Sequence, residues 1–306
     1  MSQEIRVYGE LNSHALGSLI KEAARRGART ARIMRRNFKA TEKGRKSGNR
    51  TDWVTNADKA AQRVIVKKLR QWFPTFGIIG EEGEVLGEPL VIPCTHPDLD
   101  IWFTIDPIDG TSAYIRRQSH GIGCMISLTC NGEIICVCIV DIMTGECYYF
   151  RPDSSNTWRI EDDIPESMTI DHDRPLIDQY LLLREMPDRC SPMVGALVYD
   201  GLYKDTQVTG GSIGISMAQL WKGEVGGAIL SGNSDTPWDS NPVIGMSQHM
   251  GFDFWAIYKD TDQFVLMSPG PVEETCVLEY EILVVHSSRR EEFKVWCSSK
   301  GYDCIF

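Results

Sequence analysis

The sequence predicts a layered α+β fold, and three observations favour this class. Two amphipathic helical patterns come first, antiparallel hairpin patterns follow, and strands alternate with helices only in the second half. A doubly wound parallel sheet would alternate strand and helix along the whole chain, so the order of elements favours stacked layers instead. With 306 residues, 42% of them hydrophobic, the chain can bury one large core or two coupled ones.

Two long helices are predicted in the first quarter of the chain. Apolar residues recur at three- and four-residue spacing from Leu16 to Phe38, which lays one apolar stripe along a helix. A second helix is expected at 56–72, because Thr55 and Asp58 match a capping box at its start and Pro74 stops it. The basic segment 39–50 between them is predicted as a mobile, solvated loop, with contact to an anion as the weaker alternative.

A meander of short apolar strands is predicted after the second helix. Its clearest signal is Asn131-Gly132, because Asn-Gly between apolar runs favours a tight hairpin turn. Residues 151–174 are polar and mark a loose boundary between an N-terminal half, 1–150, and a C-terminal half, 151–306. The expected strands of the first half are 77–80, 101–105, 122–130, 133–140 and 147–150.

The second half is expected to alternate helices with strands. Ile213, Met217, Leu220 and Trp221 share one face of a helix, for example. The expected helices are 212–222, 239–250 and 289–299, and the expected strands are 225–230, 252–258 and 281–286.

Composition excludes several classes of function. The net charge of -10 and a pI near 5.2 lack the basic face of a nucleic-acid binder, so no nucleic acid polymer is expected as a partner. No stretch approaches the roughly 20 apolar residues of a membrane span, and the N-terminus has no signal pattern, so a cytoplasmic protein is expected. The ten cysteines and six histidines lack zinc spacing, and several cysteines lie in apolar runs as free thiols.

Carboxylates at the ends of predicted elements point to a metal site. A strand delivers Asp106, Pro107 turns the chain, and Asp109 is expected back beside Asp106. Two adjacent carboxylates repel unless a cation lies between them, and Mg²⁺ prefers such oxygen ligands. Gly110 and Thr111 would then open a helix whose free amides face a phosphate.

Each of these residues also has a purely structural interpretation. Asp-Pro-x-Asp-Gly is good turn chemistry, and Glu81 with Glu82 suits a solvated strand end. Asp58 fits a capping box, and Asp239 fits an N-cap of the helix that follows. The order and spacing of these acidic residues, taken together, favour the functional interpretation over the structural one.

That ordered set resembles the inositol monophosphatase superfamily, which includes fructose-1,6-bisphosphatases, 3'-phosphoadenosine-5'-phosphate phosphatases and a histidinol-phosphatase branch. The matching segments are Val54-Thr55-x-Ala57-Asp58, Gly80-Glu81-Glu82, Asp106-Pro107-Ile108-Asp109-Gly110-Thr111, Thr209-Gly210-Gly211-Ser212 and Trp238-Asp239. The resemblance implies a layered α-β-α-β-α fold of the sugar-phosphatase type, two or three Mg²⁺ ions, a homodimer and inhibition by lithium.

The resemblance also implies a role for each site residue. Asp106 would bridge two ions and act in catalysis, while Glu81 and the Thr111 hydroxyl would orient the attacking water. The implied ligand sets are Glu81, Asp106 and the Ile108 carbonyl for the first ion, Asp106, Asp109 and Asp239 for the second, and Asp58 with Glu81 for a weaker third, with Glu82 behind them. The implied substrate contacts are Gly110, Thr111, Ser112, Gly211 and Ser212.

Departures from the family pattern affect the substrate more than the chemistry. Gly232 stands where inositol phosphatases usually have an acidic residue, which weakens inositol phosphate as the substrate unless Asp235 substitutes. Arg116 or Arg117 would meet a second anionic group or remain solvated loop arginines. The insertion 269–280 has no assigned counterpart.

The predicted function is therefore Mg²⁺-dependent hydrolysis of a phosphate monoester of a small soluble metabolite: an inositol or sugar phosphate, histidinol phosphate or a nucleotide bisphosphate. A haloacid-dehalogenase-type phosphatase is rejected because position 108 is Ile where that chemistry needs a second Asp. A glycosidase-like carboxylate pair does not explain five acids in this order. The remaining alternative is a family member without turnover that binds metal or a phosphorylated ligand.

Overall fold

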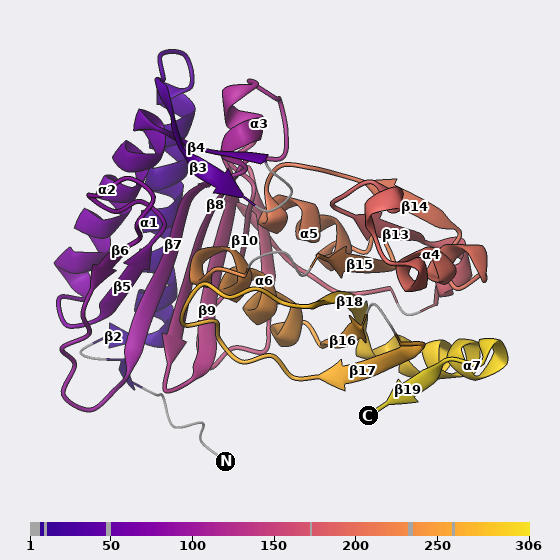
Figure 1. The fold of residues 1–306 in the computed structure, drawn as a ribbon. Coiled ribbons are helices and arrows are strands. Elements are labelled where there is room, and N and C mark those ends of the chain that lie inside the picture. Colours follow the sequence, from indigo (N-terminus) through magenta and orange to yellow (C-terminus); the bar gives the residue numbers. More distant parts are fainter. Residues whose placement is uncertain (1–6, 9–10, 47–49, 172, 232–234, 259–260) are drawn as a thin grey trace.

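Alternating layers of helices and sheets build the protein (Figure 1). A computed structural model describes the chain except for residues 1–6, 9–10, 47–49, 172, 232–234 and 259–260. Helices α1 and α2 form one outer layer, two sheets enclose α5 and α6, and α4 and α7 cover the far face of the second sheet. The predicted α-β-α-β-α order is confirmed.

The first outer layer is a pair of helices whose starts are fixed by local capping. Helix α1, Ser13–Met34, is capped by the Asn12 side chain and ends four residues before the apolar stripe does. Helix α2, Asn56–Trp72, has the predicted bounds and a complete capping box. The helices approach closely at Gly27, because a Cβ there would lie 2.5 Å from the Ile65 Cδ1 atom.

The segment between these helices is a β-hairpin where a solvated loop was predicted. Strands β3, Ala40–Lys46, and β4, Arg50–Thr55, pair antiparallel. Glu42 lies opposite Trp53 and Gly44 opposite Asp52, so Lys43 is an extra residue that forms a β-bulge. The loop prediction is wrong because it weighed composition alone, and the bulge matters for the site below.

The first sheet has eight strands in the order β12-β11-β10-β9-β8-β7-β5-β6, and only β5 and β7 run parallel. Asn131 and Gly132 both have positive φ, as a tight hairpin turn requires. Hairpin β11–β12 lies within the segment that was predicted as a polar connection. The strands are β5 Gly77–Gly80, β6 Leu90–Ile92, β7 Ile101–Asp109, β8 Gly123–Cys130, β9 Glu133–Asp141, β10 Cys147–Phe150, β11 Trp158–Glu161 and β12 Ile164–Ser167.

The second sheet has seven strands in the order β14-β13-β15-β18-β16-β17-β19 and mixes parallel with antiparallel pairs. A further small pair, β1 Val7–Tyr8 and β2 Leu11–Asn12, precedes α1. The strands of the second sheet are β13 Tyr180–Leu183, β14 Asp205–Val208, β15 Gly227–Leu230, β16 Phe252–Tyr258, β17 Gln263–Met267, β18 Tyr280–His286 and β19 Asp303–Ile305. The remaining helices are α3 Thr111–Ile115, α4 Pro192–Tyr199, α5 Ile213–Trp221, α6 Pro237–His249 and α7 Arg290–Lys300.

The core explains why the central strands are apolar on both faces. Cys124 and Ile126 of β8 pack toward α1 and α2, whereas Met125 between them packs toward α5 and α6. Helix α6 is buried on nearly all sides because it contacts both sheets, and its first turn reaches β7. In the described part of the chain, no helix combines the length and hydrophobicity needed to cross a membrane.

Candidate metal centre

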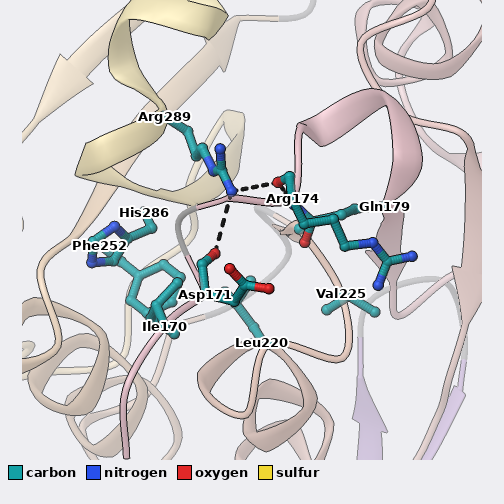
Figure 2. Close-up of a pocket in the computed structure, with 11 residues that line it drawn as sticks. Ile170, Asp171, Arg174, Gln179, Leu220, Val225, Phe252, His286 and Arg289 are labelled. Atoms are coloured by element: carbon teal, nitrogen blue, oxygen red, sulfur yellow. Dashed lines mark hydrogen bonds between the residues drawn. The ribbon is translucent and has the colours of Figure 1, made fainter.

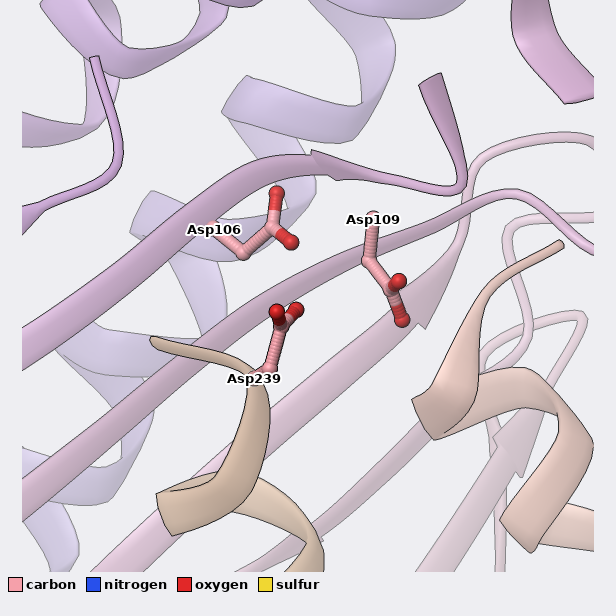
Figure 3. Close-up of side chains that lie close together, drawn as sticks. All are labelled: Asp106, Asp109 and Asp239. Atoms are coloured by element: carbon pink, nitrogen blue, oxygen red, sulfur yellow. The ribbon is translucent and has the colours of Figure 1, made fainter. Parts of the chain in front are cut away.

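Three carboxylates from distant parts of the sequence meet beside the first sheet (Figure 3). Asp106 and Asp109 come from β7, and Asp239 comes from the first turn of α6. Each offers an oxygen atom, and these atoms all lie within 4.8 Å of one another. Asp106 is 2% exposed and Asp109 is 6% exposed, so two of the three acidic groups are almost fully shielded from solvent, while Asp239 is partly buried.

A β-bulge brings Asp106 and Asp109 to the same face of the sheet. Asp106 lies opposite Met125 and Asp109 opposite Gly123, so three steps along β7 match two steps along β8. Side chains three residues apart on a regular strand point to opposite faces, and the extra residue restores both to one face. The prediction that the strand ends at Asp106 and that Pro107 turns the chain is wrong, since β7 continues through Asp109.

Asp239 is held by the N-terminal cap of α6. The cap residue is Thr236, whose hydroxyl lies 2.9 Å from Asp239 Oδ2 and 3.3 Å from the Asp239 amide. Pro237 occupies the first helical position, where no amide is needed. The alternative in which Asp239 is itself the N-cap is therefore wrong, and its carboxylate is free to point toward β7 (Figure 3).

Asp109 is tied to the start of α5 in the second half of the chain. The Ser212 hydroxyl donates to Asp109 Oδ2 at 2.5 Å, and the Gly214 amide donates to the same oxygen at 3.0 Å. Ser212 also caps α5 by accepting from the Ile215 amide. Because Ser212 is fully buried, its hydroxyl supports a carboxylate here, whereas the sequence predicted a contact with substrate.

Two glycines allow the loops around Asp109 to touch backbone to backbone. Gly211 has a φ of +88, and a Cβ there would lie 2.3 Å from the Gly121 carbonyl oxygen. Gly110 has a φ of +89, and its Cβ would lie 2.7 Å from the Ser212 nitrogen. Arg184, which sequence reasoning missed, donates to the Gly211 carbonyl at 2.6 Å.

A second acidic cluster contains Glu81, Glu82 and a buried lysine. Lys43 Nζ lies 2.9 Å from Glu81 Oε1 and 2.6 Å from Glu82 Oε1, and the three side chains are 5%, 10% and 4% exposed. Lys43 reaches this position because it is the bulged residue of β3. Nothing in the sequence separates it from the other basic residues of segment 39–50, so it was missed.

Asp58 combines the two roles that the sequence left as alternatives. Its Oδ2 atom accepts from the Thr55 amide at 2.8 Å and completes the capping box. Its Oδ1 atom lies 3.3 Å from the Thr111 hydroxyl, which also lies 3.1 Å from the Ile108 carbonyl oxygen. The cap therefore fixes the Asp58 carboxylate, and the Thr111 hydroxyl lies between it and the Ile108 carbonyl of β7.

Crowding and burial raise the pKa of several of these carboxyl groups. Burial and the charge of Glu81 raise the pKa of Asp58 to about 7, and the same two causes raise that of Glu82 to about 8. Burial and Asp239 raise the pKa of Asp109 to about 7, although Arg184 opposes the shift. The pKa of Asp106 rises well above its usual range because of burial and its acidic neighbours.

Lys43 carries positive charge into this crowded site. Burial by itself would lower the pKa of the Lys43 ammonium, but the charges of Glu81 and Glu82 raise it above its usual range. Arg184 opposes the rise in the pKa of Asp109 but does not cancel it, and Asp106, Asp109 and Asp239 remain a group of closely spaced carboxylates. Closely spaced, buried oxygen ligands of one charge are the donor set that a divalent cation such as Mg²⁺ fits.

The loop after Asp109 places backbone amides beside the carboxylates. Helix α3 begins at Thr111 as predicted but has only 5 residues. The Gly110 carbonyl accepts from the Ala113 and Tyr114 amides, and first-turn amides ahead of these have no partner within a helix. Ser112, another predicted substrate contact, is exposed.

The other substrate-side predictions are placed as follows. Arg117 lies over the Phe38 ring and donates to the Arg36 carbonyl, so it points to the segment after α1, whereas Arg116 donates to the nearby Gln118 side chain. Gly232 lies outside the described residues. The backbone of Asp235 pairs with that of Cys276, so the insertion 269–280 is anchored four residues before Asp239.

A hollow separate from the carboxylates lies near the C-terminal end of α5 (Figure 2). Its wall includes the end of α5 at Leu220 and the residue before β15, Gly226, whereas Asp109 contacts the start of α5. Arg289 closes one side by donating to the carbonyls of Asp171 and Arg174. The lining has no group of carboxylates, so the candidate chemistry belongs to the acidic clusters and not to this hollow.

Known proteins resemble this chain over the part that carries the site carboxylates. A family model described as the inositol monophosphatase family matches residues 15–251. Nus factor SuhB of Xylella fastidiosa is 36% identical over 101 residues, 33% of this chain and 32% of that protein. Nus factor SuhB of Escherichia coli is 31% identical over 134 residues, 42% and 46% of the two chains. Inositol-1-monophosphatase of Bacillus subtilis is 31% identical over 130 residues, 42% and 43%.

These matches cover less than half the length of the curated relatives. Solved structures extend the likeness of the fold: the IMPase of Thermotoga maritima has a TM-score of 0.64 at 19% identity, over 94% of this chain and 97% of that one. The inositol monophosphatase of Anabaena has a TM-score of 0.64 at 20% identity, over 94% and 96%. Because several relatives are named Nus factor, they do not support the predicted exclusion of a nucleic acid partner.

Proposed function

The chain belongs to the inositol monophosphatase family, and on this premise we propose that it is a Mg²⁺-dependent phosphatase that hydrolyses the phosphate monoester of a small soluble metabolite. The observation that carries the proposal is the convergence of Asp106, Asp109 and Asp239, whose oxygen atoms lie within 4.8 Å of one another. The candidate substrates are an inositol or sugar phosphate, histidinol phosphate and a nucleotide bisphosphate. A homodimer belongs to the same proposal.

The residues of the two acidic clusters would bind two ions. Asp106, Asp109 and Asp239 would hold one Mg²⁺, and Glu81, Asp106 and the Ile108 carbonyl would hold another. When bound, the ions supply a water of lowered pKa and neutralise charge on the phosphoryl group and the leaving oxygen. The raised pKa values of Asp109 and Asp58 support this assignment, because a bound cation relieves the repulsion that causes part of each shift.

Other groups of the chain orient the reactants. The Thr111 hydroxyl lies between Asp58 and the Ile108 carbonyl, so with Glu81 it can fix the direction in which a water's hydrogen atoms point. The Gly110 and Thr111 amides would receive the phosphate oxygens, since amides without helical partners bind anions. Gly211 and Ser212 would keep that loop in place through their contacts with Gly110 and Asp109.

Lys43 bears on the number of ions. Its ammonium group already contacts Glu81 and Glu82, which a third ion near Asp58 would need. We therefore expect two ions to bind tightly and a third to compete with Lys43.

The test is phosphate release from a panel of small phosphate monoesters with and without Mg²⁺. Wild type, Asp109→Asn and the exposed control Asp188→Asn are compared. We expect Mg²⁺-dependent release by wild type and the control, a loss of at least about 100-fold in Asp109→Asn, and one preferred compound that names the substrate class. No release from any compound while Mg²⁺ binds would overturn the proposal and favour the binding protein without turnover.

A further inference from the structure

Two cysteines near the C-terminus lie in direct contact. Cys297 is in the last turns of α7 and Cys304 is in β19, and their Sγ atoms are 2.6 Å apart. A disulfide bond is about 2.05 Å long, so little movement separates these thiols from a bond. We propose that Cys297 and Cys304 are a redox modification site at which a hydroperoxide forms a reversible disulfide that fastens the C-terminal strand to α7.

The local fold holds the two thiols face to face. Gly301 ends α7 with a φ of +79 and reverses the chain, and the Tyr302 amide donates to the Cys297 carbonyl at 2.9 Å. Strand β19 then pairs parallel to β17, with Cys304 opposite Phe264. Since β17 belongs to the second sheet and Cys297 belongs to the helix that covers it, the sheet itself sets the separation of the sulfurs.

The pair differs from the other cysteines in access and surroundings. Cys304 is half-buried, so an oxidant in solution can reach it, while Cys297 is 1% exposed and protected behind it. Contact with Cys297 and the charge of Lys294 lower the pKa of Cys304, which favours its thiolate. Cys138 and Cys147 are also neighbours, with Sγ atoms 3.5 Å apart, but both belong to strands of the first sheet and are buried in the core that it forms with α1 and α2.

The chemistry needs one hydroperoxide for each disulfide. The Cys304 thiolate attacks the peroxide, an S–O bond forms, and the O–O bond breaks with release of hydroxide or an alkoxide that takes up a proton. Cys297 then attacks the Cys304 sulfur, the S–S bond forms, and water leaves as the thiol proton is transferred. The two thiols lose two electrons and two protons in total, and the peroxide is reduced to water or to water and an alcohol.

The bond would stabilise the edge of the second sheet. β19 is the terminal strand of that sheet, and the aromatic residues beside it, Phe264, Trp296 and Tyr302, pack against one another. Loss of β19 from the edge would expose β17 and part of this cluster, and an unpaired edge strand favours association with other chains. The disulfide would restrain that opening.

The experiment treats the folded protein with hydrogen peroxide, blocks free thiols, and counts them after denaturation. We expect two fewer than the ten thiols of the reduced chain, a Cys297–Cys304 link in non-reduced peptide maps, and recovery with dithiothreitol. Cys304→Ser should form no such link, whereas the exposed-cysteine control Cys276→Ser should form it normally. Hydrogen exchange at residues 303–305 should be slower in the oxidised than in the reduced wild type.

Two results would overturn the inference. In the first, the oxidised wild type keeps all ten thiols, or links Cys138 to Cys147 and leaves Cys297 and Cys304 free. In the second, the Cys297–Cys304 link forms but exchange at residues 303–305 does not change, which removes the proposed restraint on β19.

Discussion

Lys43 offers a sharp test of how charge is balanced in the site, through the substitution Lys43→Met. The lysine is almost fully buried and contacts two carboxylates at 2.9 and 2.6 Å. Removal of one partner from a buried ion pair costs about 3–5 kcal/mol, because the remaining charge is left without compensation. Proton uptake by Glu82 limits the loss, so we expect the lower figure, about 3 kcal/mol, in the metal-free protein at pH 8.

Thermal unfolding gives the first measurement of this effect. For a chain of this size, about 3 kcal/mol corresponds to a fall of roughly 6 °C in Tm. Lys39→Met is the matched control, since Lys39 lies in the same segment and is exposed. Calorimetric titration with Mg²⁺ gives the second measurement, and Lys43→Met should bind a third ion that the wild type binds weakly. Equal Tm values for the two variants, or unchanged Mg²⁺ binding in Lys43→Met, would show that Lys43 does not balance the charge of Glu81 and Glu82.

Three further predictions follow from the same geometry. Burial and acidic neighbours raise the pKa values of Asp58 and Asp109 from 3.8 to about 7, so the stability that protonation gives the metal-free fold is complete below pH 3.8 and is lost as pH rises through 7. Mg²⁺ should therefore raise Tm more at pH 8 than at pH 5, and an equal rise at both would count against the shifts. Gly211→Ala should lower Tm by several degrees, because the added Cβ would lie 2.3 Å from a backbone oxygen. Gly210→Ala is the control, because a Cβ there has no atom within 4 Å, and its Tm should stay near that of the wild type. Thr111→Val should lower kcat about 100-fold with little change in Mg²⁺ affinity, and the opposite split in calorimetry and kinetics would reassign the hydroxyl to metal binding.

Local signals predicted the helices of the N-terminal half well. Helix α2 has its predicted bounds because both its start and its end depend on neighbouring residues: Thr55 and Asp58 at the cap, and Pro74 after it. The hairpin at Asn131-Gly132 is equally local. The five carboxylates were found because each follows or begins an element whose pattern is visible in the sequence.

The features that were missed depend on pairing with distant strands. The bulge that aligns Asp106 with Asp109 exists only against β8, and the bulge that turns Lys43 inward exists only against β4. Arg184 follows β13 directly and donates to the Gly211 carbonyl between β14 and α5, and no sequence spacing relates the two residues. Register, which the sequence pattern leaves open in short or polar strands, is therefore the physical reason that the two bulges and the inward position of Lys43 were missed.

Anomalous diffraction from crystals soaked in Mn²⁺ tests whether Asp106, Asp109 and Asp239 hold a divalent cation. We expect strong anomalous peaks bounded by these three carboxylates and by Glu81. Excess Mg²⁺ should weaken these peaks, and Asp109→Asn should remove them in part. If crystals show no anomalous peak at these residues, although the same protein hydrolyses phosphate monoesters in the presence of Mg²⁺, these carboxylates do not hold the ion.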